Sequence, residues 1–471
     1  MYTLGIDSST QSIKALVYDT DAKSVAATVS VNFGKELAEY ASPDGFLPNP
    51  DNLVRCANPL MWLAALDKVL AKLQSAFDTS KIAAVGGDGQ QHGSVYLNGA
   101  WAAALATLDP AKDLASQIAP CLARKVAPIW MDSSTSKECR ALDEHFGDRL
   151  RTTTGSPAIE RFTGPQIMKF ANDEHAAYDA TARIHLVSSF LASVLAGEDA
   201  PIDTGDGAGM NLLNLETLSW DEEICEFTAP GLISKLPPVA IPGQKTTLGL
   251  ARYFTKYGLR AGIPIVPFTG DNPASLVGTG ADKPGVAVIS LGTSDVFFAA
   301  MDRFQTDPDG YGHVFGNPSG GFMSLACVKN GSLAREKVRA ELGVDYKFFD
   351  ETAFELTPPG NNGRRAFPFF ESEITPLHDA TGIEANFDWP SASAEEKVRA
   401  IIEGQVNNIF ERTRWIGSFQ TIRVTGGASR SRGIRDTISA IFGAKVETLD
   451  VTDSAALGGA ILAAREVGCQ Q

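Results

Sequence analysis

The chain has few cysteines and no pattern that would join them. The six cysteines are scattered over 471 residues, and no two of them form a Cys-x-x-Cys pair. They are Cys56, Cys121, Cys139, Cys225, Cys327 and Cys469. This spacing signals neither a zinc site nor a disulfide framework. Reduced thiols are therefore expected, as in cytoplasmic proteins, and the chain is long enough to be stable without cross-links.

Long apolar runs and an excess of positive charge are also absent. No uninterrupted apolar stretch approaches the ~20 residues that a membrane-spanning helix needs. The N-terminal MYTLGIDSST lacks the basic and apolar regions of a secretory signal. The formal net charge of −15 disfavours nucleic acid and anionic membranes as partners. We therefore expect a cytoplasmic protein, in which backbone N–H groups can still bind an anionic ligand.

The two commonest nucleotide-binding motifs are missing as well. The sequence has no GxxxxGK(S/T), and no GxGxxG follows the first apolar run. Three turns of small residues instead follow β-type runs, at residues 7–12, 292–295 and 426–429. Gly, Ser and Thr expose the N–H and hydroxyl groups that hold phosphate oxygens. Each turn alone is better explained by an ordinary hairpin or helix cap, so only the three together favour a phosphate site.

Strand-type and helix-type segments alternate along the chain, which predicts an α/β protein. Residues 2–6 and 13–18 are apolar β-type runs around a polar turn and predict a hairpin. Residues 286–291 and 296–300 repeat this pattern. Apolar residues at helical spacing predict a helix within residues 52–77. The repeated hairpin indicates two duplicated α/β lobes.

The stretch FTGDNPASL, residues 268–276, has two interpretations. It follows an apolar run that is typical of a short buried strand. Asn272 is a favoured helix N-cap and Pro273 suits the first helical position, so the local sequence favours the start of a helix. The alternative is that Asp271, at the end of a strand, takes part in chemistry. On the local sequence alone, the start of a helix is the favoured interpretation.

Four short motifs, in this order along the chain, carry a resemblance to a known family. They are GQQHGS at residues 89–94, WMDSST at 130–135, ERFTG at 160–164 and FTGDNPASL at 268–276. With them the sequence resembles the FGGY family of carbohydrate kinases over nearly its whole length, and most closely the xylulokinases of the animal type. The resemblance implies an α/β, two-lobed, actin-like ATPase fold (ribonuclease H-like), in which duplicated lobes flank a central cleft. The lobes would be residues 1–260, with the sugar site and the first phosphate hairpin, and residues 261–471, with the catalytic base and the nucleotide site.

The same resemblance implies a carbohydrate kinase that transfers a phosphoryl group from ATP, with Mg²⁺, to a primary hydroxyl of a sugar. For xylulokinases the reaction converts D-xylulose into D-xylulose 5-phosphate. The resemblance is also compatible with a homodimer. Two alternatives stay open. One is a kinase of the same family that acts on ribulose, a pentitol or glycerol. The other is a sugar sensor or an ATPase of the same fold without sugar kinase activity.

The resemblance carries the family's functional residues over to matching positions. The general base corresponds to Asp271, and Asp7 is expected to hold Mg²⁺ through water. The sugar contacts correspond to Gln91, His92, Arg161, Asp271 and Asn272. The nucleotide contacts correspond to Thr10, Gln11, Gly292, Thr293, Tyr346, Gly426, Gly427 and Ser431. Two of these depart from the animal-type pattern, because Ser431 stands in the place of an Asn and Tyr346 in the place of a Trp near the adenine.

The residue types suit this chemistry. Phosphoryl transfer has a loose transition state, so alignment and charge neutralisation dominate, and a carboxylate such as Asp271 can orient the attacking hydroxyl and accept its proton. Asn272 offers hydrogen-bond donors and an acceptor, whereas Arg161 offers donors only. Each residue also has a purely structural explanation: His92 as a hydrogen-bonded loop residue, Arg161 in a surface ion pair, Asp7 as a turn cap. The resemblance favours the functional explanation.

Overall fold

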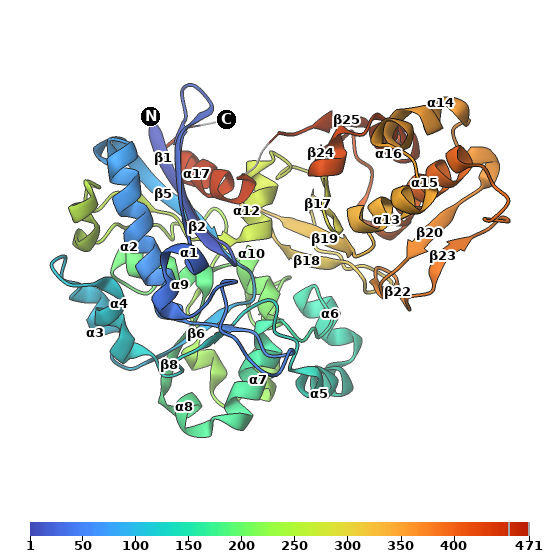
Figure 1. Ribbon diagram of the computed structural model, residues 1–471. Coiled ribbons are helices and arrows are strands. Elements are labelled where there is room, and N and C mark those ends of the chain that lie inside the picture. The colour runs from blue at the N-terminus through green and yellow to red at the C-terminus, as the bar shows by residue number, and fades with distance from the viewer. Residues whose placement is uncertain (451–452, 470–471) are drawn as a thin grey trace. The chain divides into compact units, whose positions relative to one another are not determined.

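The computed structural model describes residues 1–450 and 453–469 of the chain. The chain forms two compact units, each built around one central sheet (Figure 1). The first unit consists of Met1–Gly278, Phe315–Gly321 and residues 453–469; the second consists of Thr279–Val314 and residues 322–450. None of the six cysteines takes part in a disulfide bond within the described part of the chain. None of the described helices combines the length and the apolar character that crossing a membrane requires.

The first unit contains a seven-stranded sheet with β1 (Tyr2–Ser8) near its middle. β1 pairs antiparallel with β2 (Ser12–Asp19) and parallel with β5 (Ile82–Gly89). The predicted N-terminal hairpin is therefore confirmed, but its strands are longer than the apolar runs, so that Asp7 lies within β1. The remaining strands of this sheet are β3 (Ser24–Asn32), β13 (Leu248–Gly249), β14 (Pro264–Ile265) and β15 (Thr269–Gly270).

The helix predicted within residues 52–77 is confirmed as α2 (Pro59–Ala76). It begins with Asn58 as the N-cap, whose side chain accepts a backbone hydrogen bond, and with Pro59 at the first helical turn. Its apolar face is buried in one core together with apolar side chains of β1 and β2. α2 therefore covers one face of the first sheet.

The other face of this sheet is covered by α17 (Ser454–Glu466) and α12 (Asp271–Gly278), which pack against each other. The last helix of the chain thus lies beside its first strand (Figure 1). A Cβ atom on Gly5 would stand 1.8 Å from a backbone oxygen of α17, and one on Gly458 would stand 1.9 Å from a backbone oxygen of α12. Only glycine allows these backbones to approach so closely.

A further hydrophobic core of the first unit lies around β6 (Ser94–Asn98) and β8 (Thr181–Leu186), which pair antiparallel. The other helices of this unit are α1 (Phe33–Glu36), α3 (Trp101–Ala106), α4 (Leu114–Ile118), α5 (Ser136–Phe146), α6 (Asp148–Thr154), α7 (Thr163–Asp173), α8 (His175–Ala180), α9 (Val187–Ala196), α10 (Thr204–Gly207) and α11 (Glu222–Thr228). Its other short strands are β4 (Cys56–Ala57), β7 (Ala127–Pro128), β9 (Ile202–Asp203), β10 (Leu213–Asn214), β11 (Ser219–Trp220) and β12 (Val239–Ala240).

The sheet of the second unit repeats the strand pairing of the first. β16 (Val286–Leu291) pairs antiparallel with β17 (Asp295–Met301) and parallel with β24 (Thr421–Thr425). This is the arrangement of β1 with β2 and β5, so the predicted second hairpin and the duplication are confirmed. The other strands of the sheet are β18 (His313–Gly316), β19 (Phe322–Val328) and β25 (Lys445–Thr448).

Helices α13 (Ser332–Leu342), α15 (Ala394–Thr413) and α16 (Arg432–Phe442) bury their apolar side chains in the core of the second unit. α15 begins with a reciprocal cap, in which Ser393 and Glu396 bond each other's backbone N–H groups. The smaller elements are α14 (Ala353–Leu356), β20 (Ala366–Phe369), β21 (Glu373–Ile374), β22 (Leu377–His378) and β23 (Gly382–Ala385).

The two units divide the chain differently from the predicted lobes of 1–260 and 261–471. Residues 261–278 belong to the first unit, because β14 and β15 pair with β5 and α12 packs on α17. The C-terminal helix belongs to the first unit for the same reason. α12 also begins two residues before Pro273, the predicted first helical position, at Asp271, so that Asn272 lies in its first turn. Asp271 and Asn272 are therefore in the same unit as His92.

Candidate active site

Three aspartates meet where strands of the first sheet end. Asp7 and Asp88 are direct partners in the parallel pairing of β1 with β5. β15 pairs with the end of β5, and Asp271 follows β15 directly. Asp7 and Asp88 are buried, whereas Asp271 is partly exposed. The sheet thus brings together carboxyl groups from three distant segments of the chain.

The environment of these carboxyls favours their protonated forms. Burial, followed by the negative charges of Asp7 and Asp271, raises the pKa of Asp88 well above its usual range. Burial also raises the pKa of Asp7, although a hydrogen bond with Asp88 and the charge of Lys14 oppose this. Burial and then the charge of Asp7 raise the pKa of Asp271 to about 7. The cluster therefore carries less negative charge at neutral pH than three exposed aspartates would.

Asp88 was not recognised from the sequence. It lies inside the Gly-rich run that precedes His92, but its place beside Asp7 depends on the register of two strands about eighty residues apart. Among the described residues, no N–H or hydroxyl group donates to either of its oxygens. Asp206 was missed as well: it is fully buried and accepts a hydrogen bond from the Ser188 hydroxyl. Neither residue belongs to a motif that would have identified it.

The side chain of Asp271 is held by its neighbours. The backbone N–H of Asn272 donates to Asp271 Oδ1 at 2.8 Å, and the side-chain amide of Asn272 reaches the same oxygen at 3.1 Å. The Asn272 amide also donates to Gln91 Oε1 at 2.9 Å, and the backbone N–H of Gln91 donates to the Asp271 carboxyl. Gln91 Nε2 is buried and has no hydrogen-bond partner among residues 1–450 and 453–469. The structure therefore brings together three of the predicted residues, Gln91, Asp271 and Asn272.

His92 and Arg161 meet at the ring of Phe162. The His92 ring stacks on Phe162 with centroids 4.3 Å apart, and the Arg161 guanidinium lies 5.8 Å from the same ring. His92 Nδ1 lies 2.9 Å from the carbonyl oxygen of Gly209; because a carbonyl only accepts, Nδ1 carries the hydrogen. A Cβ atom on Gly209 would stand 2.8 Å from this ring. The imidazole is thus fixed in position and tautomer.

Thr10 and Gln11 lie in the turn between β1 and β2. The indole N–H of Trp130, in the WMDSST motif, donates to Thr10 Oγ1 at 2.8 Å. Gln11 is exposed, and its carbonyl accepts a hydrogen bond from the N–H of Phe33. Both were predicted as nucleotide contacts, and both lie in the first unit with the aspartate cluster.

The other predicted nucleotide residues gather in the second unit around a cavity of about 450 Å³. Gly292, Thr293, Tyr346, Gly427 and Ser431 all line it. Gly426 does not line it but shapes the turn, because its φ is +87° and a Cβ there would stand 2.4 Å from the Leu291 carbonyl oxygen. The sequence did not identify four charged residues of the lining, which are Arg335, Glu336, Asp350 and Arg430.

Several side chains around this cavity are fixed by the fold. Ser431 is the N-cap of α16 and accepts a hydrogen bond from the Ile434 N–H at 3.3 Å. The buried Arg335 of α13 forms two hydrogen bonds with the Asp295 carboxylate of β17, at 2.6 and 2.8 Å. Tyr346 keeps 58% of its surface exposed, so its ring is accessible to a ligand.

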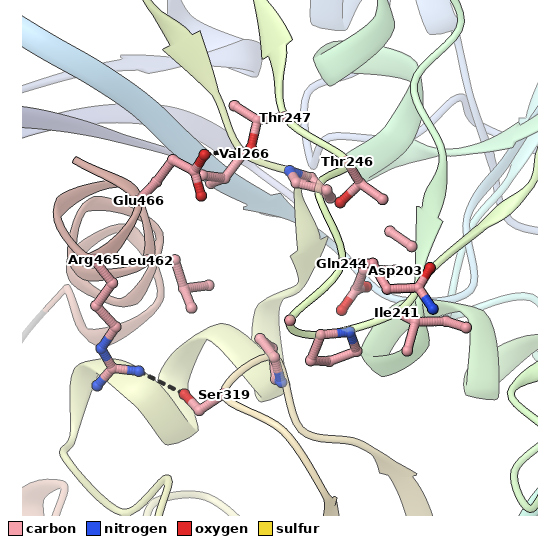
Figure 2. Close-up of a pocket in the computed structure, with 15 residues that line it drawn as sticks. Asp203, Ile241, Gln244, Thr246, Thr247, Val266, Ser319, Leu462, Arg465 and Glu466 are labelled. Carbon is pink, nitrogen blue, oxygen red and sulfur yellow. Dashed lines mark hydrogen bonds between the residues drawn. The ribbon is translucent and has the colours of Figure 1, made fainter. Parts of the chain in front are cut away.

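Figure 2 shows a separate cavity of about 310 Å³ within the first unit, between the end of α17 and the loop of residues 240–247. Arg465 donates to the Ser319 hydroxyl at 2.6 Å, and the Thr247 hydroxyl donates to Glu466 at 2.8 Å. None of the predicted site residues lines this cavity. It is therefore not part of the candidate active site.

Comparison with known proteins gives consistent matches over the whole chain. The model of the N-terminal domain of the FGGY family of carbohydrate kinases matches residues 124–278, and that of the C-terminal domain matches residues 287–467. Xylulose kinase 2 of Arabidopsis thaliana is 39% identical, over 99% of this chain and 88% of the relative. Xylulose kinase of Rattus norvegicus is 39% identical, over 97% of this chain and 87% of the relative.

Solved structures agree on the fold. A xylulose kinase from Bifidobacterium adolescentis superposes with a TM-score of 0.81 at 23% identity, over 100% of this chain and 94% of that chain. A gluconate kinase from Lactobacillus acidophilus has a TM-score of 0.81 at 20% identity, over 100% and 90% of the two chains. The predicted two-lobed, actin-like α/β fold is confirmed. Because kinases named for different sugars superpose equally well, the fold alone does not select the acceptor.

Proposed function

The chain belongs to the FGGY family of carbohydrate kinases, and we propose that it transfers a phosphoryl group from ATP to D-xylulose, giving D-xylulose 5-phosphate. The identity of 39% to proteins named xylulose kinase, over 97–99% of this chain, supports this acceptor. The observation that carries the mechanism is the position of Asp271 at the end of a strand, bonded to Asn272 and next to Gln91.

In this proposal Asp271 is the general base. With a pKa of about 7, the Asp271 carboxyl is ionised in a large fraction of the molecules at neutral pH, and the ionised form can accept a proton. An ordinary aspartate would be a much weaker base. The N–H groups of Asn272 and Gln91 hold the carboxylate in one orientation, which suits a reaction that depends mainly on alignment.

Gln91, His92, Arg161 and Asn272 supply the sugar contacts. A ketose presents several hydroxyl groups and a carbonyl, so it needs both donors and acceptors at fixed positions. Arg161 has donors only, whereas the amides of Gln91 and Asn272 have both. The unpaired Gln91 Nε2 is a buried donor that a sugar hydroxyl would satisfy.

ATP binds the cavity of the second unit in this proposal. The backbone of Gly292 and Thr293 and the turn at Gly426 and Gly427 offer N–H groups to phosphate oxygens. The exposed ring of Tyr346 offers a stacking surface for the base, and Ser431 lies in the same lining. Thr10 and Gln11, which belong to the first unit, are the remaining proposed nucleotide contacts.

Mg²⁺ is the proposed metal, held by Asp7 through water. Among the described residues no group of three or more His, Cys, Asp or Glu side chains is arranged to hold a metal ion. Mg²⁺ does not need such a group, because it is commonly bound by one or two carboxylates together with water and phosphates. The buried Asp7 Oδ1, which has no hydrogen-bond partner, fits this requirement. When bound, the ion would neutralise charge on the phosphates.

The test is ADP release with ATP, Mg²⁺ and a panel of acceptors that includes D-xylulose, D-ribulose, pentitols, gluconate and glycerol. We expect the highest kcat/KM with D-xylulose. A higher value with another member of the panel would replace the acceptor and keep the family activity. Sugar binding without turnover would indicate a sensor, and ATP hydrolysis that no sugar changes would indicate an ATPase.

The environment proposed for the enzyme is the cytoplasm, without nucleic-acid or membrane partners. The net charge of −15 and six free cysteines support it. The proposed homodimer is tested by light scattering of the purified protein, in which a mass of about 50.1 kDa would exclude it.

A further inference from the structure

Helix α13 connects the two ends of the cavity in the second unit. At its start, the N–H of Ser332 donates to the carbonyl oxygen of Gly292 at 3.0 Å, so the helix begins at the small-residue turn. One turn later, Glu336 accepts a hydrogen bond from the Tyr346 hydroxyl at 3.0 Å. Ser332, Gly292, Glu336 and Tyr346 all line the cavity. Glu336 therefore lies between the phosphate-binding turn and the exposed aromatic ring.

This order matches the order of groups in a nucleotide. Glu336 follows Ser332 by four positions in the helix, and this spacing corresponds to a rise of about 6 Å along the helix axis. In any nucleoside phosphate the ribose stands between the phosphates and the base. With the phosphates at Gly292 and the base at Tyr346, the ribose falls beside Glu336. We propose that Glu336 binds a ribose hydroxyl and makes the site selective for ribonucleotides over deoxyribonucleotides; this rests on the ATP site of the proposed function.

Glu336 has one oxygen available for this contact. Tyr346 and Arg339 both bond Oε2, at 3.0 and 3.1 Å. No hydrogen bond or ion pair of the described residues involves Oε1. Arg339 also lies 4.1 Å from the centre of the Tyr346 ring, so it steadies the ring and the carboxylate together. A carboxylate that accepts from a ribose hydroxyl recurs in nucleotide-binding proteins.

The other charged groups of the lining are less suited to a hydroxyl. Arg335 is tied to Asp295 by two hydrogen bonds and offers no acceptor. The Asp350 carboxyl already takes a hydrogen bond from the Ser431 hydroxyl at the start of α16. Among the described residues of the lining, Glu336 is the carboxylate that is bonded directly to Tyr346 and lies on the helix that begins at the Gly292 turn.

The test compares the binding of ADP, 2′-deoxy-ADP and 3′-deoxy-ADP by calorimetry, with Mg²⁺ and without sugar, so that no turnover occurs. We expect one of the two deoxy forms to bind the wild-type protein about 10- to 100-fold more weakly than ADP, because a hydroxyl bonded to a charged acceptor is lost. In Glu336→Ala all three should bind within about twofold of one another. In Glu336→Gln the preference should be intermediate.

Glu341→Gln is the matched control, because Glu341 lies exposed on the same helix outside the cavity lining. The Glu341→Gln variant should keep the wild-type preference for ADP over the deoxynucleotide. Unchanged circular dichroism spectra should show that every variant is folded. Equal binding of the three nucleotides by the wild-type protein, failure to bind ADP, or an unchanged preference in Glu336→Ala would each overturn the inference. A ribose preference without xylulose turnover would instead refute the proposed acceptor and leave Glu336 in its role.

Discussion

Asp271 is both the first residue of a helix and the proposed catalytic base. The local sequence favoured a helix at this point, and α12 does begin there. Its first residue is also the carboxylate that lies beside Asp7 and Asp88, with a pKa of about 7. The helix supplies a rigid backbone, and burial supplies the basicity. The two interpretations drawn from the sequence are therefore compatible.

Asp271→Asn should lower kcat by about 10²–10⁴-fold, because the isosteric amide cannot accept the proton. In the wild type, kcat/KM should rise with pH through about 7 as the base ionises. The native carboxyl also holds its proton more tightly than in the unfolded chain, so the stability that this proton supplies is lost as the pH rises from 3.8 to about 7. The variant should therefore gain stability relative to wild type between about pH 4 and pH 7 in urea titrations, with no further gain above pH 7. Activity near wild type would leave Asp271 with only a structural role; exposed Asp179→Asn is the control.

Asp199 should show the opposite dependence on pH. Burial alone would raise its pKa, but His185, Arg183 and Trp101 outweigh burial and lower the pKa to about 2, from 3.8. The ionised carboxylate therefore stabilises the fold above pH 3.8, and this contribution is lost as the pH falls toward 2. Asp199→Asn should lower the urea midpoint at pH 7 and much less at pH 3. A decrease in the urea midpoint that is the same at pH 3 and pH 7 would contradict this prediction. Asp148→Asn, which changes an exposed carboxylate, is the control.

At the scale of elements, the first sheet and its last two helices form one packed unit. α17 touches β1 and α12 through glycines, with no room for a side chain. Because α12 begins with Asp271, the packing of the C-terminal helix positions the proposed base. The carboxylate of Asp453, which precedes α17, pairs with Lys14 of β2 at 2.7 Å, so the helix start is tied to the hairpin.

Gly458→Ala should destabilise the first unit although alanine is the better helix former. The added Cβ would stand 1.9 Å from the Ala274 carbonyl oxygen, so α17 and α12 must separate. We expect a loss of about 1–3 kcal/mol in urea unfolding, and a larger loss in sugar turnover than in ADP binding. Gly99→Ala is the control, since nothing lies within 4 Å of its Cβ position. An unchanged or higher stability of the Gly458 variant would show that the contact is not tight.

At the scale of the whole molecule, the two compact units carry different parts of the candidate site. The proposed sugar residues and the base belong to the first unit, and the nucleotide cavity belongs to the second. Each part is preformed by its own sheet and helices. In the proposed function the acceptor is assigned to the first unit and the phosphoryl donor to the second.

Hydrogen exchange should separate these two sites. D-xylulose alone should slow exchange around Gln91, His92 and the start of α12. ADP alone should slow exchange around Gly292, Tyr346 and Gly427, because each ligand stabilises the segments that it contacts. Mass spectrometry of peptides from these segments measures both effects. Protection by xylulose confined to the second unit would contradict the assignment of the sugar site.

Much of the fold was predictable because it follows from local patterns. The two hairpins, α2 and the alternation of strands and helices are set by apolar spacing, caps and turns, which neighbouring residues determine. The order of four motifs was sufficient to identify the family. The lobe boundary was less predictable, since residues 261–278 show no local sign that they pair with a strand ending at residue 89.

The sequence alone thus identified the family and the α/β duplication and singled out Asp271 as the proposed base, because each depends on residues close together in the chain or on a motif. Tertiary structure decided that Asp88 stands beside Asp7, that α17 packs on α12, and that Glu336 lines one cavity with Gly292 and Tyr346. These are contacts between distant segments. Strand register and helix packing set them, and neither leaves a periodic signal in the sequence.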